Sequence, residues 1–189
     1  MNRPSLTFVG AILAAALGPI TVAFANADSK VRPGPVLQVT ASDELGERLV
    51  ITGAIADRDG RPVSDVELHG YQTDATGHYT PDKPMDEPHA RLAGFLKSAD
   101  GRFELRTIRP GGYTKMIRLG DRDRHIPPHI HIDITGPGHA ERRLQVVFAD
   151  DPLLLDPYWA DWVFKLRQPV LSLERDGAMV RGRLVIALD

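Results

Sequence analysis

Short apolar segments alternate with turn-forming residues along most of this sequence. The segments have the length of β-strands, and Asp-Gly or Gly-Pro pairs commonly mark the breaks between them. Strands are expected at residues 49–55, 63–71, 92–96, 102–108, 130–134, 144–148 and 180–188. Only residues 157–166 favour a helix, for which Asp156 is the expected N-cap. The pattern predicts an all-β fold, an antiparallel β-sandwich with long loops and at most one short helix.

Composition narrows the class of protein further. The 189 residues are enough for one ordinary domain and a leader, and 42% of them are hydrophobic, so the chain can form a sizeable core. The sequence has no cysteine, which excludes disulfides, thiolate metal sites and cysteine nucleophiles. Its formal charge of −2 gives no electrostatic reason to expect nucleic acid or an anionic membrane as a partner.

The beginning of the chain has the features of a secretory signal peptide, predicted at residues 1–25. Arg3 is followed by an apolar stretch and then by a small-x-small pattern, with cleavage expected after Ala25 or Ala27. The alternative, an uncleaved membrane anchor, requires a longer apolar run, since a span needs about 20 residues. We therefore expect an exported protein, periplasmic or secreted, without stable membrane insertion after cleavage.

Two further segments complete the expected organisation. Residues 26–36 are polar and contain two prolines, which is typical of a linker. Residues 37–189 carry all the predicted strands and are expected to form one β-sandwich domain.

Residues 129–134 alternate between two kinds of side chain. One set is isoleucine, and the other is His129, His131 and Asp133. On a β-strand these sets face opposite sides, and residues two apart are separated by about 6.6–7 Å, so two imidazoles can bind one metal ion. Taken alone, the pair fits a solvated polar face equally well.

Two of the four tyrosines stand just after glycine turns at the ends of predicted strands. Tyr79 closes residues 74–79, and Tyr113 closes residues 107–113. Phenolate is a hard anionic donor, and hard oxygen ligands combined with imidazole suit iron(III) better than zinc. Either tyrosine alone also fits a residue that simply packs at a turn.

Four blocks of this sequence occur in a characteristic order. They are residues 60–79, 100–113, 128–131 and 144–152. In that order they resemble the motifs of the intradiol ring-cleavage dioxygenases, the family of protocatechuate 3,4-dioxygenase and catechol 1,2-dioxygenase. The resemblance implies cleavage of a catechol-type ring between its two hydroxylated carbons with O2, which gives a cis,cis-muconate-type diacid. The implied partners are therefore a small catechol-type substrate and O2, and a homo-oligomer is left open.

The resemblance also implies which residues form the site. An iron(III) ion would be held by Tyr79, Tyr113, His129 and His131, with a hydroxide in the fifth position. In the family, the tyrosine that matches Tyr113 is the ligand that leaves when a catechol binds. Gln145 matches an active-site glutamine placed near the reacting ring.

One position departs from the family pattern. Ile126 stands three residues before the first histidine, where family members usually carry an arginine whose charge steadies the activated ring. Arg124 is the expected catalytic replacement, and Arg91, Arg118 and Arg122 are further candidates to fold inward. The departure keeps a second hypothesis open, that of a secreted non-catalytic β-sandwich binding module with a vestigial metal site.

Three other aromatic residues have structural interpretations. Tyr71 follows the apolar alternation of its strand and is expected in the core. Trp159 and Trp162 are compatible with core packing, a subunit contact or the wall of a substrate pocket.

Overall fold

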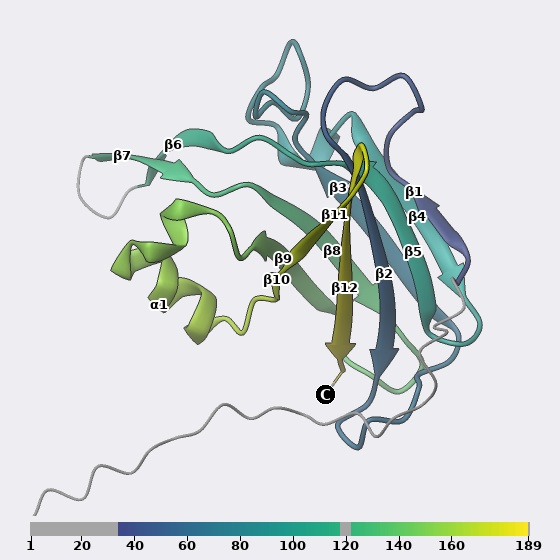
Figure 1. The fold of residues 1–189 in the computed structure, drawn as a ribbon. Helices are drawn as coiled ribbons and strands as arrows, with labels where there is room; N and C mark the ends of the chain where they lie inside the picture. Colours follow the sequence, from purple (N-terminus) through teal and green to yellow (C-terminus); the bar gives the residue numbers. More distant parts are fainter. Residues whose placement is uncertain (1–33, 118–121, 189) are drawn as a thin grey trace, which may run out of the picture. The chain divides into compact units, whose positions relative to one another are not determined.

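The computed structural model describes residues 34–117 and 122–188 (Figure 1). The predicted signal peptide and residues 26–33 of the predicted linker lie outside these residues, so export stays a prediction. The first half of the described chain contains β1 (Val36–Gln38), β2 (Arg48–Ala56), β3 (Val66–Gln72), the 3-10 helix η1 (Glu87–His89), β4 (Leu92–Ser98), β5 (Arg102–Ile108) and β6 (Tyr113–Ile117). The second half contains β7 (Arg122–Ile126), β8 (His129–Thr135), β9 (Arg142–Phe148), the 3-10 helix η2 (Pro152–Leu155), α1 (Pro157–Lys165), β10 (Val170–Leu171), β11 (Leu173–Asp176) and β12 (Met179–Ala187).

Two five-stranded sheets pack against each other and form the predicted β-sandwich. Their strand orders are β1-β5-β2-β12-β11 and β10-β9-β8-β3-β4. Alternate residues of the strands are buried between the sheets, as the burial pattern of β12 illustrates. The fully buried members of this core include Leu49, Ile51, Phe103, Leu105 and Ile132. Burying each such side chain contributes about 1.5–3 kcal/mol, so this core carries the fold without cross-links.

The predicted all-β sandwich is confirmed, but its two sheets are mixed and not antiparallel throughout. β12 pairs with β2 in parallel along its whole length, and β1 with β5 and β10 with β9 are also parallel pairs. Turn residues indicate only hairpins between consecutive strands, whereas parallel neighbours need a long connection that leaves no local pattern. β2 and β12 stand at opposite ends of the described chain and meet only in the folded sheet.

The seven predicted strands are present, with shifted ends. The strand expected from residue 63 begins at Val66, because Asp65 adopts a φ of 55° that interrupts extended backbone. The predicted helix is confirmed as α1, and the Asp156 carboxylate accepts a hydrogen bond of 2.8 Å from the backbone N–H of Tyr158. Within the described residues, no helix has the length and apolar character required to cross a membrane.

Outside the two sheets, β6 and β7 form a separate two-stranded ribbon. Figure 1 shows this ribbon and α1 on the same side of the sandwich, next to the ends of β8 and β9. The two elements touch, since the guanidinium carbon of Arg124 lies 4.0 Å from the ring centroid of Tyr158. The ribbon was not predicted, and it forms one wall of the candidate site.

Candidate metal centre

The histidine pair of β8 faces away from the main core. Ile130 and Ile132 are fully buried between the sheets, whereas His129 and His131 lie on the opposite face of the strand. That face is covered as well, because only 4% of His129 and 6% of His131 is exposed. The structure therefore excludes a solvated polar face for this pair.

Three potential metal-binding atoms converge at this place. The Tyr79 hydroxyl oxygen lies 3.4 Å from His129 Nε2 and 3.2 Å from His131 Nε2, and the two Nε2 atoms are 3.1 Å apart. Two nitrogen or oxygen ligands bonded to one ion, at about 2.0–2.1 Å each, stand about 2.8–3.4 Å apart. The three side chains thus already have the spacing of ligands around a single ion.

The hydrogen bonding of His129 leaves the correct nitrogen free for such an ion. Its Nδ1 lies 2.7 Å from the carbonyl oxygen of Pro127, which can only accept, so Nδ1 carries the proton and donates. Nε2 then presents its lone pair toward Tyr79 and His131. A backbone carbonyl that fixes the tautomer in this way is a common partner of metal-binding histidines.

Tyr113 lies beside these three residues. Its ring centroid is 5.7 Å from that of Tyr79, in an edge-to-face arrangement, and 5.9 Å from that of His129. Its hydroxyl donates a hydrogen bond of 3.2 Å to Glu87 Oε1. The structure thus brings all four predicted ligands together, with the Tyr113 hydroxyl turned toward Glu87.

Burial controls the protonation of the four side chains. It lowers the pKa of His131 to about 3 and also lowers the pKa of His129, so both imidazoles are neutral near pH 7. Burial likewise raises the pKa of Tyr79 and Tyr113, and the nearby Glu87 carboxylate raises both further. Buried phenolates therefore need a compensating cation. Two neutral imidazoles and two phenols of this kind fit a hard, highly charged ion such as iron(III).

Tyrosine is needed to complete such a site. Over the described ranges, no group of three or more His, Cys, Asp or Glu side chains is arranged to hold a metal ion. The oxygen atoms that the structure places next to the two histidines are the phenol oxygens of Tyr79 and Tyr113. Neither donor would be found by a search for carboxylate and histidine clusters.

Two interlocking glycine turns explain why Tyr79 and Tyr113 meet. Gly77 has a φ of 87°, and a Cβ at this position would overlap the carbonyl oxygen of Gly112. A Cβ at Gly111 would lie 2.6 Å from a carbonyl oxygen of the opposite turn. The backbones of the two turns are thus in direct contact, at a distance that only glycine permits.

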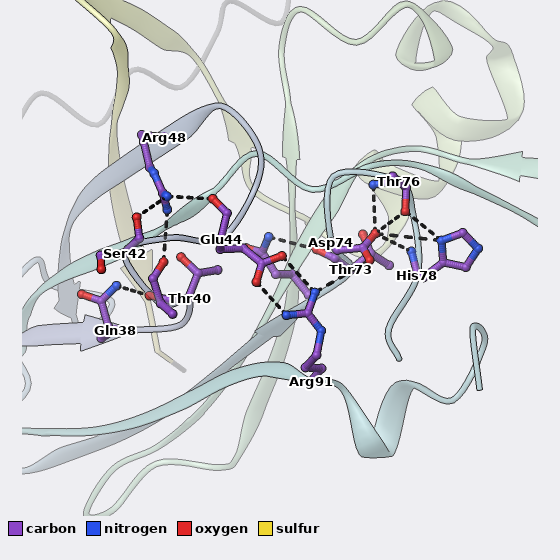
Figure 2. Close-up of polar contacts among 12 residues, drawn as sticks. Gln38, Thr40, Ser42, Glu44, Arg48, Thr73, Asp74, Thr76, His78 and Arg91 are labelled. Carbon is purple, nitrogen blue, oxygen red and sulfur yellow. Dashed lines mark hydrogen bonds and ion pairs between the residues drawn. The ribbon is translucent and has the colours of Figure 1, made fainter. Parts of the chain in front are cut away.

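The turn before Tyr79 is also held by polar contacts (Figure 2). Asp74 Oδ1 accepts hydrogen bonds of 2.9 Å and 2.7 Å from the backbone N–H and the hydroxyl of Thr76, and one of 3.1 Å from the backbone N–H of His78. Arg91 donates bonds of 2.6 Å and 2.9 Å to Glu44 and lies 3.9 Å from Asp74. The expectation that Arg91 folds into the metal centre was therefore wrong, because two carboxylates hold it in this loop.

Removing the Asp74 carboxylate is expected to destabilise this turn in a pH-dependent way. Burial alone would raise the pKa of Asp74, but the hydrogen bonds from Thr76 and His78 hold it below its ordinary value. The stabilisation is therefore complete above the unfolded pKa of about 3.9 and is lost as the pH falls through the lower pKa of the folded state. Asp74→Ala should lower the free energy of unfolding by about 1–3 kcal/mol at neutral pH.

Urea unfolding of the wild type and Asp74→Ala, at neutral pH and near the pKa of Asp74, tests this prediction. The difference between the two proteins should shrink at the lower pH. Asp82→Ala, which changes an exposed carboxylate of the adjacent loop, serves as the control and should have little effect at either pH. An equal loss in both Asp74→Ala and Asp82→Ala would contradict the role given to Asp74.

A cavity of about 350 Å³ reaches this cluster at Tyr113, while Tyr79, His129 and His131 lie behind its lining. Its walls include Tyr113, Ile126, Gln145, Tyr158, Trp159 and Trp162. Gln145 is the cross-strand partner of His131, so the two side chains lie on the same face of the sheet. Trp159 is buried in a second hydrophobic cluster with Tyr79, Tyr113 and Ile126, and Trp162 packs against it, so core packing and a pocket wall both apply to this pair.

The arginine candidates are not at the donor atoms. Ile126 lines the cavity, and Arg124 stacks over the outer aromatic wall at Tyr158 instead of reaching the histidines. The side chains of Arg118 and Arg122 lie outside the part of the chain that the structure describes.

Several residues near the site were missed or misplaced from sequence. Tyr71 is not in the main core, because it is half-buried on the outer face of β3 and its ring stacks on His131 with centroids 4.3 Å apart. Its alternation with His69 was the available signal. Glu87 and Lys115 also line the cavity, but they lie in the short 3-10 helix η1 and in the unpredicted ribbon, where no periodic pattern marks them.

Comparisons with known proteins agree with this geometry. A family model described as "Dioxygenase" matches residues 18–185. The chain is 32% identical over 123 residues to the protocatechuate 3,4-dioxygenase beta chain of Burkholderia cepacia, covering 61% of this chain and 51% of that one. It is 27% identical over 127 residues to a catechol 1,2-dioxygenase of Acinetobacter baylyi, covering 62% of this chain and 41% of that one. The chain thus spans about half the length of these curated relatives.

Solved structures give the same result. The dioxygenase domain of a dioxygenase and carbohydrate-binding protein fusion from Streptomyces sp. SirexAA-E matches with a TM-score of 0.58 and 26% identity, covering 85% of this chain and 91% of that one. A second structure, 3-chlorocatechol 1,2-dioxygenase from Rhodococcus opacus 1CP, shows the same fold with a TM-score of 0.63 at 24% identity. The match covers 82% of this chain and 64% of that one. The chain belongs to the intradiol dioxygenase family.

Proposed function

We propose that this protein is a non-haem iron(III) dioxygenase that cleaves a catechol-type ring between its two hydroxylated carbons. The reaction consumes one O2 per ring and gives a cis,cis-muconate-type diacid. The observation that carries the proposal is the convergence of the Tyr79 oxygen with Nε2 of His129 and His131, all within 3.4 Å of one another. Tyr113 packs against Tyr79 and His129 and connects this group to the cavity that it lines.

Four side chains would hold the ion, namely those of Tyr79, Tyr113, His129 and His131. When bound, ferric iron supplies Lewis acidity that lowers the pKa of the catechol hydroxyls. The Tyr113 hydroxyl has an acceptor outside the donor set, Glu87 Oε1 at 3.2 Å. In this proposal, Glu87 would hold the phenol in this position when substrate takes its place at the ion.

The cavity supplies the other requirements of the reaction. Ile126, Trp159 and Trp162 form apolar walls that suit an aromatic ring. Gln145 contributes an amide next to His131, in position to hydrogen-bond the hydroxylated edge of the ring. The positive charge that the family places at position 126 is absent, so this chain must steady the activated ring by other contacts.

Absorption spectroscopy with oxygen uptake tests the proposal. The purified full chain loaded with Fe(III) should be coloured by phenolate-to-iron charge transfer, and the visible band should shift when a catechol is added without oxygen. Admission of air should then consume one O2 per ring, tested with catechol, protocatechuate and hydroxyquinol. A colourless protein after iron loading would overturn the proposal. Tight iron binding without uptake on any of the three would favour a non-catalytic binding module.

A further inference from the structure

The β6–β7 ribbon carries two positive charges on its cavity side. Lys115 and Arg124 are direct cross-strand partners, and so are Tyr113 and Ile126 two residues further along. Directly opposite residues of an antiparallel pair, and residues two apart on one strand, project to the same face. All four side chains therefore share the face on which Tyr113 and Ile126 line the cavity.

Both cations are in contact with other parts of the cavity wall. Lys115 lines the cavity itself, and the Arg124 guanidinium lies over the ring of Tyr158, another lining residue, at 4.0 Å. The ring of Tyr158 keeps Arg124 at the outer rim, whereas Lys115 stands closer to Tyr113. The positive charge is thus on the side of the cavity that is remote from the core.

The acidic residue of the cavity compensates for only part of this charge. Glu87 Oε1 lies 3.4 Å from Lys115 Nζ and is shared with the Tyr113 hydroxyl at 3.2 Å. Among the described residues that line the cavity, Glu87 is the only acidic one, and its contact is with Lys115 and not with Arg124. Like charges placed directly opposite on a β-ribbon destabilise it unless an anion lies between or beside them. A half-exposed lysine with one long, shared ion pair is free to bind such an anion.

We propose that Lys115, with Arg124 at the rim, forms an anion subsite, and that the natural substrate is a catechol with an acidic ring substituent such as a carboxylate. The aromatic and aliphatic walls hold the ring, and the two cations hold the substituent at the cavity mouth. A volume of about 350 Å³ is sufficient for one substituted ring. The identity of the ring rests on the proposed function, whereas the anion subsite is a property of the cavity alone.

Binding of two matched, unreactive probes tests the subsite without turnover. Phenol and 4-hydroxybenzoate differ by one carboxylate, and neither has the second hydroxyl that ring cleavage requires. The chain has two tryptophans, Trp159 and Trp162, and both line the cavity, so quenching of their fluorescence reports binding directly. Titrations should be made with iron-free and with Fe(III)-loaded protein, at low and at high salt.

The wild type should prefer 4-hydroxybenzoate to phenol in both forms. Lys115→Gln should reduce this preference about fivefold to twentyfold, as expected for loss of one partly exposed charged contact, and high salt should weaken it as well. Lys115→Glu should reverse the preference, while the affinity for phenol stays unchanged. Lys97→Gln, which removes an exposed lysine of β4 outside the cavity, is the matched control and should behave as the wild type.

Unchanged discrimination in Lys115→Gln and Lys115→Glu would overturn the subsite. This outcome is independent of the proposed function, since neither probe needs iron or O2. Suppose that the preference for 4-hydroxybenzoate over phenol depends on Lys115 but the iron-loaded protein takes up no oxygen. The subsite then stands and the dioxygenase proposal fails. If the iron-loaded protein takes up oxygen but the discrimination between the two probes does not depend on Lys115, the dioxygenase proposal stands and the subsite fails.

Discussion

Tyr79→Phe is expected to lower the affinity for ferric iron by more than about 100-fold and to remove most of the visible absorption. Changes to groups that only support a metal ligand already cost about 10–100-fold, and Tyr79 supplies a donor atom itself. Its oxygen lies 3.2 Å and 3.4 Å from the two histidine Nε2 atoms, so no neighbouring group can replace it without rearrangement. The phenylalanine ring keeps the buried packing of Tyr79 against Tyr113, and the fold should be retained.

Competition with a chelator of known affinity, followed by the visible band, measures this effect. Tyr158→Phe is the matched control, since it removes a phenol hydroxyl from the outer wall of the same cavity and should leave iron affinity unchanged. Near-wild-type iron affinity and colour in Tyr79→Phe would show that the phenol is not a ligand. Thermal unfolding of both variants without iron separates loss of the metal from loss of the fold.

Gly77→Ala is expected to cost about 2–5 kcal/mol of unfolding free energy. The φ of 87° at Gly77 is strained for any residue with a Cβ, which costs about 1–2 kcal/mol. The new methyl group would also overlap the carbonyl oxygen of Gly112, and overpacking of this kind adds about 1–3 kcal/mol. Because this contact joins the two turns before Tyr79 and Tyr113, iron affinity should fall together with stability.

Gly60→Ala separates the two contributions. Gly60 has a φ of 79°, but a Cβ there meets no atom within 4 Å, so only the conformational strain of about 1–2 kcal/mol should appear. Urea unfolding of both variants, with iron titration in parallel, provides the comparison. A loss in Gly77→Ala no greater than that in Gly60→Ala would mean that the turn-to-turn contact does not hold the tyrosines together.

Local patterns in the sequence identified the parts of the site that depend on short segments. The alternation at residues 129–134 placed His129 and His131 on one face of a strand, and the glycine turns placed Tyr79 and Tyr113 at strand ends. These arrangements follow from the geometry of a few consecutive residues. What such patterns cannot supply is the distance between segments, so the meeting of the four side chains was available only through the family resemblance.

The parts that sequence did not predict depend on long-range packing. The parallel pairing of β2 with β12 has no local turn to mark it. The face of the β6–β7 ribbon toward the cavity mixes Tyr113 and Ile126 with Lys115 and Arg124, so no apolar alternation marks its strands. Glu87 reaches the site from the short 3-10 helix η1, within a segment rich in proline. Arg91 was misplaced because its two carboxylate partners, Glu44 and Asp74, are distant in sequence from each other.

Tyr71 shows how a correct pattern can be misread. In β3 the residues that face the core are Val66, Leu68 and Gln72, and Tyr71 belongs to the other set with His69. The core assignment counted Tyr71 with the apolar alternation of the strand, to which it does not belong. The structure places it directly opposite His131, with the two rings parallel to within 3°. Tyr71 thus packs against a predicted metal ligand and restricts the orientation of that imidazole.

The central claim is that one ferric ion joins four side chains from separate turns and strands. A crystal structure of the Fe(III)-loaded protein, with anomalous scattering measured at the iron absorption edge, tests it most directly. A single iron peak should be bonded to the phenol oxygens of Tyr79 and Tyr113 and to Nε2 of His129 and His131. An iron peak elsewhere, or one bonded to the histidines but to neither phenol, would contradict the claim.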